Sequence, residues 1–277
     1  TQGVLLRDCF DRKLSPELAD FVSCMDRRQY QLYLLLRLQT EEEDTSEELL
    51  RLNPNDFYCC QIGASYYYRG RYLEAIELLN RTYDIAAHEG NIRQMCDAKL
   101  FLGNCYSDTR QAELMAESYR VARKIALVLG DSHRVSDIDY NLGSTYLELR
   151  DAEQAYQLLQ TVRRRDALYY HKLATALEML GRREEALEAL AQGKAELPNV
   201  SISPAAAEKM LNVVEYRLLH PKHLHEEAYS RLLTDCFSYL RENLPIGYAR
   251  FHLPYMLELL EAERRYKEAY KLLSEFS

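Results

Sequence analysis

The chain has 277 residues, 47% of them hydrophobic and 28% charged, with a formal net charge of −8. It therefore has enough apolar residues for a sizeable core, and its acidic balance argues against nonspecific nucleic-acid binding, which needs a basic surface. No apolar run approaches the roughly 18 residues of a membrane span, and the N-terminus lacks a secretory signal. Seven scattered cysteines favour a reducing, cytoplasmic setting over a disulfide framework.

In chain order, we expect residues 1–26 to form an N-terminal linker or helix and residues 27–277 to form one helical-repeat domain. Helices are predicted at 27–39 and 46–52, followed by helix hairpins. The predicted hairpins span 57–87, 92–129, 132–162, 166–197, 204–240 and 247–276. In the first, a tight turn at 69–71 joins helix A to helix B, and Gly90 ends helix B as a left-handed cap.

A small residue recurs at the same place in four of these hairpins, with spacings of 40, 40 and 31 residues. The four stretches are Ile62-Gly63-x-x-Tyr66, Leu102-Gly103-x-x-Tyr106, Leu142-Gly143-x-x-Tyr146 and Leu173-Ala174-x-x-Leu177. Self-similarity at this period indicates stacked helix hairpins. We expect the small residues to let helix A approach helix B closely, with Ala75, Ala155 and Ala186 as matching small surfaces on helix B. Ala228 and Ala269 are expected to play the same part in the last two hairpins.

This pattern resembles the tetratricopeptide repeat (TPR) family over about residues 27–277. The best match runs from Asp166 to Pro198, although the chain lacks the family's tryptophan altogether. The 40-residue units resemble the sensor domain of Gram-positive peptide-responsive TPR regulators. The resemblance implies an all-α fold, a right-handed α-solenoid of about six antiparallel helix hairpins.

In the TPR family, helix A lines an inner groove that holds an extended peptide or a partner helix. Carried onto this chain, the resemblance implies a peptide-binding groove formed by Tyr67, Asp97, Asn104, Asp108, Asp137, Tyr140, Asn141, Glu148, His171 and Lys172. The amides of Asn104 and Asn141 can both donate to and accept from a peptide backbone; alternatively, they only bond a neighbouring helix end. The many carboxylates predict an acidic groove suited to a ligand with cationic and apolar groups.

The clamp with which co-chaperone TPR domains bind chaperone tails resembles Asn104, Asn141 and Lys172. Two further lysine positions of that clamp are occupied by Leu100 and Leu168, which counts against a co-chaperone. No phosphate-binding glycine loop or nucleophile motif is present. His220, His223 and His225 form the one metal-like cluster, but an exposed turn explains it as well. We expect no catalytic residue, no metal and no cofactor.

Two functions fit these observations. The first is the ligand-sensing regulatory domain of a bacterial cytoplasmic transcription regulator, whose DNA-binding part would precede Thr1. Its partners would be a peptide or protein ligand in the groove and, through the C-terminal hairpins, a second copy of the chain; this chain itself would bind no nucleic acid and no membrane. The alternative is a passive protein-assembly adaptor.

Overall fold

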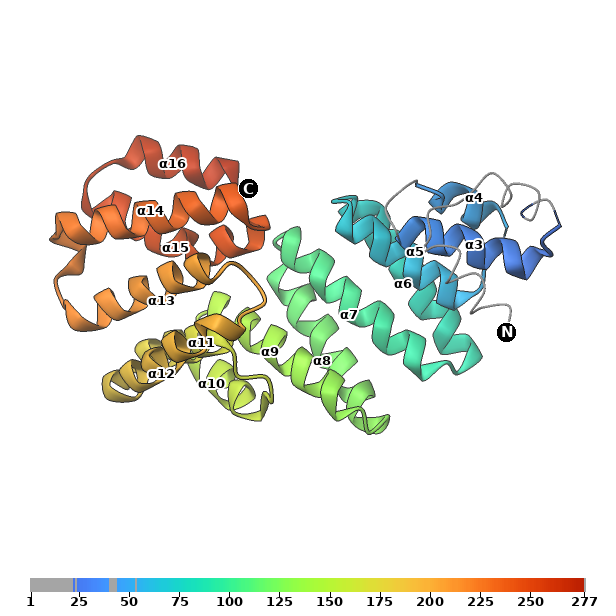
Figure 1. Cartoon of the computed structure of the whole chain (residues 1–277), viewed down its shortest axis with the longest axis horizontal. Coiled ribbons are helices and arrows are strands. Elements are labelled where there is room, and N and C mark those ends of the chain that lie inside the picture. The colour runs from blue at the N-terminus through green and yellow to red at the C-terminus, as the bar shows by residue number, and fades with distance from the viewer. Residues whose placement is uncertain (1–21, 23, 40–43, 53, 277) are drawn as a thin grey trace. The chain divides into compact units, whose positions relative to one another are not determined.

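The computed structural model describes residues 22, 24–39, 44–52 and 54–276, and this part of the chain consists of helices without any strand (Figure 1). Most of the predicted N-terminal segment 1–26 lies outside the described residues. The helices are α3 (Arg27–Gln39), α4 (Ser46–Arg51), α5 (Asp56–Tyr68), α6 (Tyr72–Glu89), α7 (Ile92–Asp108), α8 (Ala112–Val128), α9 (Ser132–Glu148), α10 (Ala152–Thr161), α11 (Ala167–Met179), α12 (Arg183–Ala195), α13 (Pro204–Leu219), α14 (Glu227–Asn243), α15 (Ile246–Ala262) and α16 (Tyr266–Glu275). Two short 3-10 turns, η1 (Leu197–Asn199) and η2 (His223–His225), complete them.

Polar side chains begin several of these helices and left-handed residues end others. The side chain of Asn55 accepts a hydrogen bond from the Tyr58 amide at the start of α5, and Asp166 accepts one from the Tyr169 amide at the start of α11. These bonds satisfy backbone donors that have no partner inside the helix. Gly90 follows α6 with a φ of 74°, as predicted, because a glycine adopts this conformation without a steric penalty.

The recurring glycines lie where the two helices of a hairpin meet. A Cβ atom added to Gly63 on α5 would lie 2.7 Å from Cγ of Leu79 on α6, and one added to Gly143 on α9 would lie 3.2 Å from Cγ of Leu159 on α10. Ala75 and Ala155, one helical turn before these leucines, are fully buried. The prediction that small residues permit close helix packing is therefore confirmed in both hairpins.

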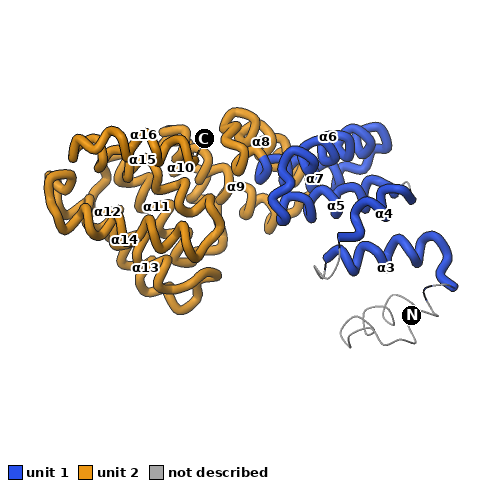
Figure 2. Tube along the Cα trace, turned by 90° about the horizontal axis from the view of Figure 1, so that it is seen from above, with its two compact units in different colours: residues 1–105 blue, residues 106–277 orange. Residues whose placement is uncertain are grey.

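The chain divides into two compact units, residues 1–105 and 106–277, and the boundary falls inside α7 (Figure 2). In the first unit, α5 packs on α6 and α3 packs on both α4 and α5. In the second unit, α8 packs on α9, α9 on α10 and α11 on α12, and the order continues through α13, α14, α15 and α16. Each helix thus packs mainly on its neighbours in the chain, as expected of a repeat architecture.

The predictions are least accurate in the fifth hairpin. The 3-10 turn η2 occupies residues 223–225, and the second helix of this hairpin, α14, ends at Asn243 and not at the predicted residue 240. Ala228, predicted in a small-residue position, is exposed, whereas Tyr229 is fully buried. The buried stripe of α14 begins at Tyr229 and continues through Leu233 to Leu240, and this apolar spacing decides which face turns inward.

Candidate ligand-binding site

Within residues 106–277, side chains of α15 contact side chains of α11. The imidazole of His171 on α11 stacks on that of His252 on α15, with ring centres 5.2 Å apart, and meets the edge of Phe251 at 5.6 Å. The ammonium group of Lys172 lies 2.9 Å from the centre of the Phe251 ring. Two residues predicted to face the groove therefore contact the chain's own helix. His171 is only 1% exposed.

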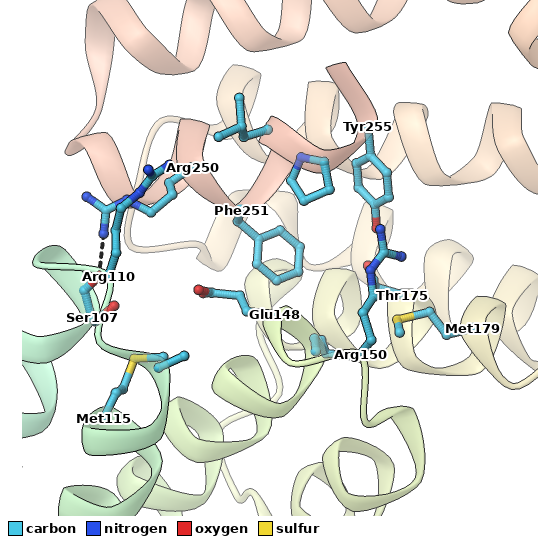
Figure 3. Close-up of a pocket in the computed structure, with 14 residues that line it drawn as sticks. Ser107, Arg110, Met115, Glu148, Arg150, Thr175, Met179, Arg250, Phe251 and Tyr255 are labelled. Atoms are coloured by element: carbon cyan, nitrogen blue, oxygen red, sulfur yellow. Dashed lines mark hydrogen bonds between the residues drawn. The ribbon is translucent and has the colours of Figure 1, made fainter. Parts of the chain in front are cut away.

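Two cavities lie along these helices. One includes an α11 residue that precedes His171 and Lys172 in the sequence, and the other includes α11 residues that follow them. The larger has a volume of about 350 Å³ and is lined by Ser136, Asp137, Tyr140, Asn141, Val162, Arg164, Asp166, Leu168, Ser201 and Tyr248. The smaller has a volume of about 250 Å³ and is lined by Ser107, Arg110, Ala112, Met115, Leu147, Glu148, Arg150, Thr175, Met179, Arg250, Phe251, Leu253, Pro254 and Tyr255 (Figure 3). Helices α9, α11 and α15 contribute to both.

The larger cavity contains three of the predicted site residues: Asp137, Tyr140 and Asn141. Asp137 is exposed, and the other two are half-buried. Burial raises the pKa of the Tyr140 hydroxyl, so this group remains a neutral donor near pH 7. The wall also holds Arg164, which pairs with Asp166 and donates to the Ser201 hydroxyl at 2.8 Å. The cavity thus offers an amide, a phenol and charged groups to a ligand.

The smaller cavity brings three guanidinium groups around one carboxylate. In Figure 3, Arg110 and Arg250 lie beside each other, Arg150 extends toward Tyr255, and Glu148 projects between them. The Glu148 side chain is exposed in the cavity, whose walls reduce its contact with bulk water. The pKa of Glu148 is raised by this desolvation, against the opposing charges of Lys172 and Arg250.

Some of the carboxylates expected in an acidic groove are paired within this unit. Asp108, one of the predicted site residues, lies 3.4 Å from the guanidinium of Arg250, and Glu178 lies 2.7 Å from that of Arg217. These carboxylates are neutralised by the chain's own arginines. Sequence position does not show which charges are paired. Asp137 is nevertheless exposed in the larger cavity, so the expectation of a ligand with cationic groups stays a prediction.

His171 and His252 form a buried pair whose charging is strongly disfavoured. Burial, the neighbouring His252 and the charge of Lys172 hold the pKa of His171 well below its usual value. Burial lowers the pKa of His252 to about 4, although Nδ1 lies 2.9 Å from the Tyr248 carbonyl oxygen. Neither Nε2 atom has a hydrogen-bond partner within the described residues. Both rings are therefore neutral at pH 7 and act as packing groups.

The other predicted site residues belong to residues 1–105. Tyr67 is half-buried and packs edge-on against Tyr68, with ring centres 5.2 Å apart, and against Phe101 at 6.4 Å. Asp97 and Asn104 are half-buried on α7. Tyr68 is 72% exposed, so this unit carries an aromatic patch that reaches solvent. The tenth residue, Lys172, is covered by Phe251, as described above.

Sequence reasoning missed Arg110, Arg150 and the whole contribution of α15. A signal for the two arginines existed, since each lies two residues beyond a helix A and they are 40 residues apart, which is the repeat period. Phe251 carries no such signal, because only the fold brings α15 to α11.

The three-histidine loop has partners of its own. His220 stacks on Tyr216 at 4.0 Å and lies 3.1 Å from Glu226, and His223 meets the edge of Tyr229 at 4.7 Å. Within the part of the chain that the structure describes, no group of three His, Cys, Asp or Glu residues is arranged to hold a metal. Over the same residues, none of the helices combines the length and apolarity that crossing a membrane requires.

No protein-family model matches the sequence, and no curated protein matches it either. Solved structures do match. A Rap protein complexed with Competence and Sporulation Factor is similar over 94% of this chain and 77% of its own, with a TM-score of 0.67 and 14% identity. The apo form of RapI is similar over 90% of this chain and 68% of its own, with a TM-score of 0.57 and 15% identity. A putative kinesin light chain of Podosopora anserina with TPR-like repeats is similar over 66% of this chain and 94% of its own, with a TM-score of 0.50 and 19% identity.

At these identities the likeness is one of fold. It agrees with the close approach of the hairpin helices at Gly63 and Gly143, the order in which the helices pack, and the helical content described above. The predicted fold class is thereby confirmed: the chain is a TPR-like helical-repeat protein.

Proposed function

We propose that the chain is a non-catalytic, peptide-binding TPR-like regulatory domain. The observation that carries this proposal is the larger cavity on α9 and α11, where Asp137, Tyr140 and Asn141 meet. Its volume of about 350 Å³ is in the range of ligand sites. An asparagine amide there can bond a peptide backbone in both directions, whatever the peptide's sequence.

The comparisons support the proposal through fold alone. The solved structure with the highest TM-score among those reported above is a Rap protein complexed with Competence and Sporulation Factor. A shared fold does not by itself transfer a ligand. The proposal therefore rests on the cavity, and the likeness raises its plausibility.

Helix α15 supplies the element through which a ligand would act. It covers His171 and Lys172 through Phe251 and His252, and it also contributes Tyr248 to the larger cavity. A ligand that fills this cavity contacts α11 and α15 at once. It shifts the balance between two positions of α15 only if it binds one of them better.

The finer proposal is a cytoplasmic transcription regulator in which this domain senses a ligand and a separate segment binds DNA. The 40-residue repeat units, which resemble those of peptide-responsive regulators, support it. The sequence of the whole gene product tests this part directly, because a helix-turn-helix segment has recognisable features. A gene product with no such segment would contradict it.

The peptide proposal is tested with a hexapeptide library applied to the 277-residue chain, with binding of the selected peptides measured by calorimetry. The variant Asn141→Ala is expected to weaken binding at least tenfold while the helical circular dichroism stays unchanged. Asn243→Ala is the matched control, because its amide caps the end of α14 on the Tyr239 carbonyl. Equal affinity of Asn141→Ala and the control would place the ligand elsewhere.

A further inference from the structure

The smaller cavity has an excess of positive charge that the protein does not neutralise. Three guanidinium groups line it and one carboxylate faces them. Arg250 is engaged by Asp108 at 3.4 Å and by the carbonyl oxygen of Ser107. Within the described residues, the side chains of Arg110 and Arg150 take part in no ion pair.

Two of the guanidinium groups also repel each other. Arg110 and Arg250 lie beside each other on one side of the cavity (Figure 3), and burial together with the charge of Arg250 lowers the pKa of Arg110. Nε of Arg250 is buried and has no hydrogen-bond partner in the described part of the chain. An anion between these groups would relieve the repulsion and offer them acceptors.

The arginines come from three separate elements of one compact unit. Arg110 lies in the turn after α7, Arg150 in the turn after α9, and Arg250 on α15. The two turn residues have nearly the same backbone conformation, with φ values of 60° and 62°. The repeat therefore presents two equivalent side chains, one hairpin apart, toward the same cavity. A site assembled in this way depends on the fold and not on a local run of basic residues.

The remaining walls set the size and character of the ligand group. Met115, Leu147, Met179 and Phe251 are apolar, and Thr175 adds a buried hydroxyl. A volume of about 250 Å³ is smaller than most sites for whole drug-sized ligands. It accommodates one end of a peptide or one acidic side chain. Arginine suits such a group because its planar fork matches a carboxylate in two parallel hydrogen bonds.

We propose that the cavity is a carboxylate-binding subsite, in which Arg110, Arg150 and Arg250 receive either the C-terminal carboxylate or an acidic side chain of the peptide ligand. This inference rests on the proposed function, since it names the chemistry of the same ligand. Glu148 opposes the incoming charge, and the excess of guanidinium groups outweighs it.

The subsite is first tested without any peptide. Glutarate, a small dicarboxylate, is titrated into the 277-residue chain by calorimetry, with the uncharged glutaramide as comparison. Glutarate is expected to bind and glutaramide is not. Arg150→Met and Arg110→Met should each weaken glutarate binding at least tenfold, because each removes a charged donor fork. Arg150→Lys should weaken it less, since the charge is kept.

Arg264→Met is the matched control. Arg264 occupies the equivalent turn before α16, also has a positive φ, of 57°, and does not line the cavity. The control removes the same charge from the same backbone conformation, and it should leave glutarate binding unchanged. An equal loss in Arg264→Met and Arg150→Met, or equal binding of glutaramide, would overturn the subsite.

The second test uses peptides from the hexapeptide library in free-acid and C-terminally amidated forms. A loss of at least tenfold on amidation assigns the carboxylate to the peptide terminus; a loss only on Glu→Gln or Asp→Asn exchange assigns it to a side chain. If peptides bind with no effect of either change or of Arg150→Met, the subsite is wrong and the proposed function stands. If glutarate binds through the arginines and no peptide binds, the peptide function is wrong.

Discussion

The ammonium group of the half-buried Lys172 on α11 lies 2.9 Å from the centre of the Phe251 ring on α15. Burial lowers the pKa of Lys172 to about 7, against the opposing charge of Glu148. The same lysine that a peptide groove would offer to a ligand is thus held by the chain's own helix. Because folding lowers the pKa of Lys172, the free energy of unfolding depends on pH.

We expect Lys172→Met to flatten the rise of stability with pH between about 7 and 9.5. The folded-state pKa of Lys172 lies below the unfolded value of about 10.4, so over this window the unfolded chain binds more protons and stability rises with pH. Denaturant titrations at pH 7 and 9.5 measure this difference. A variant with the full wild-type slope would show that Lys172 keeps an ordinary pKa in the folded protein.

The buried pair of His171 and His252 predicts a loss of stability at acidic pH. The pKa of His252 is lowered to about 4 and that of His171 is lowered well below 6.5, so the unfolded chain binds more protons as pH falls through 6.5. Stability contributed by the neutral pair is complete above about pH 6.5 and is lost toward pH 4. His252→Gln should reduce this loss while its amide can still donate to the Tyr248 carbonyl. Melting curves at pH 7 and 5 provide the test, and an unchanged difference would argue against the buried neutral pair.

Gly63→Leu should destabilise residues 1–105 by roughly 1–3 kcal/mol, the usual cost of overpacking. Even a Cβ atom at this position would lie 2.7 Å from Cγ of Leu79, so α5 and α6 must separate. Gly247→Leu is the control, because the nearest atom to its added Cβ is 4.0 Å away. Hydrogen exchange of the α5 and α6 amides reports the effect. Equal protection in both variants would mean that the crossing is not tight.

Arg123→Met should cost about 3–5 kcal/mol, because it leaves a buried carboxylate without its counter-ion. Asp139 is fully buried and is held by Arg123 from α8 and by the Thr161 hydroxyl at 2.6 Å from α10. The comparison variant is Arg231→Met, whose partner Glu227 is exposed, and it should lose less than about 1 kcal/mol. Chemical denaturation measures both. Similar losses would show that the buried pair adds nothing beyond a surface pair.

The sequence by itself determined the repeat and most helix positions. The glycines at 63 and 143 recur because these hairpin crossings leave little room for a side chain, and this constraint leaves a period that is visible in the residues alone. Gly90 likewise marks a helix end, since a left-handed cap is a local requirement of the backbone. Local constraints of this kind can be recognised without any coordinates.

The character of the candidate site was decided only by the tertiary structure. Whether Asp108 adds negative charge to a groove depends on Arg250, which lies 142 residues later in the chain and pairs with it. Whether His171 faces a ligand depends on His252, which reaches it only because α15 folds back onto α11. Charge pairing and burial are properties of residues brought together from distant positions, and the period of a repeat carries no information about such partners.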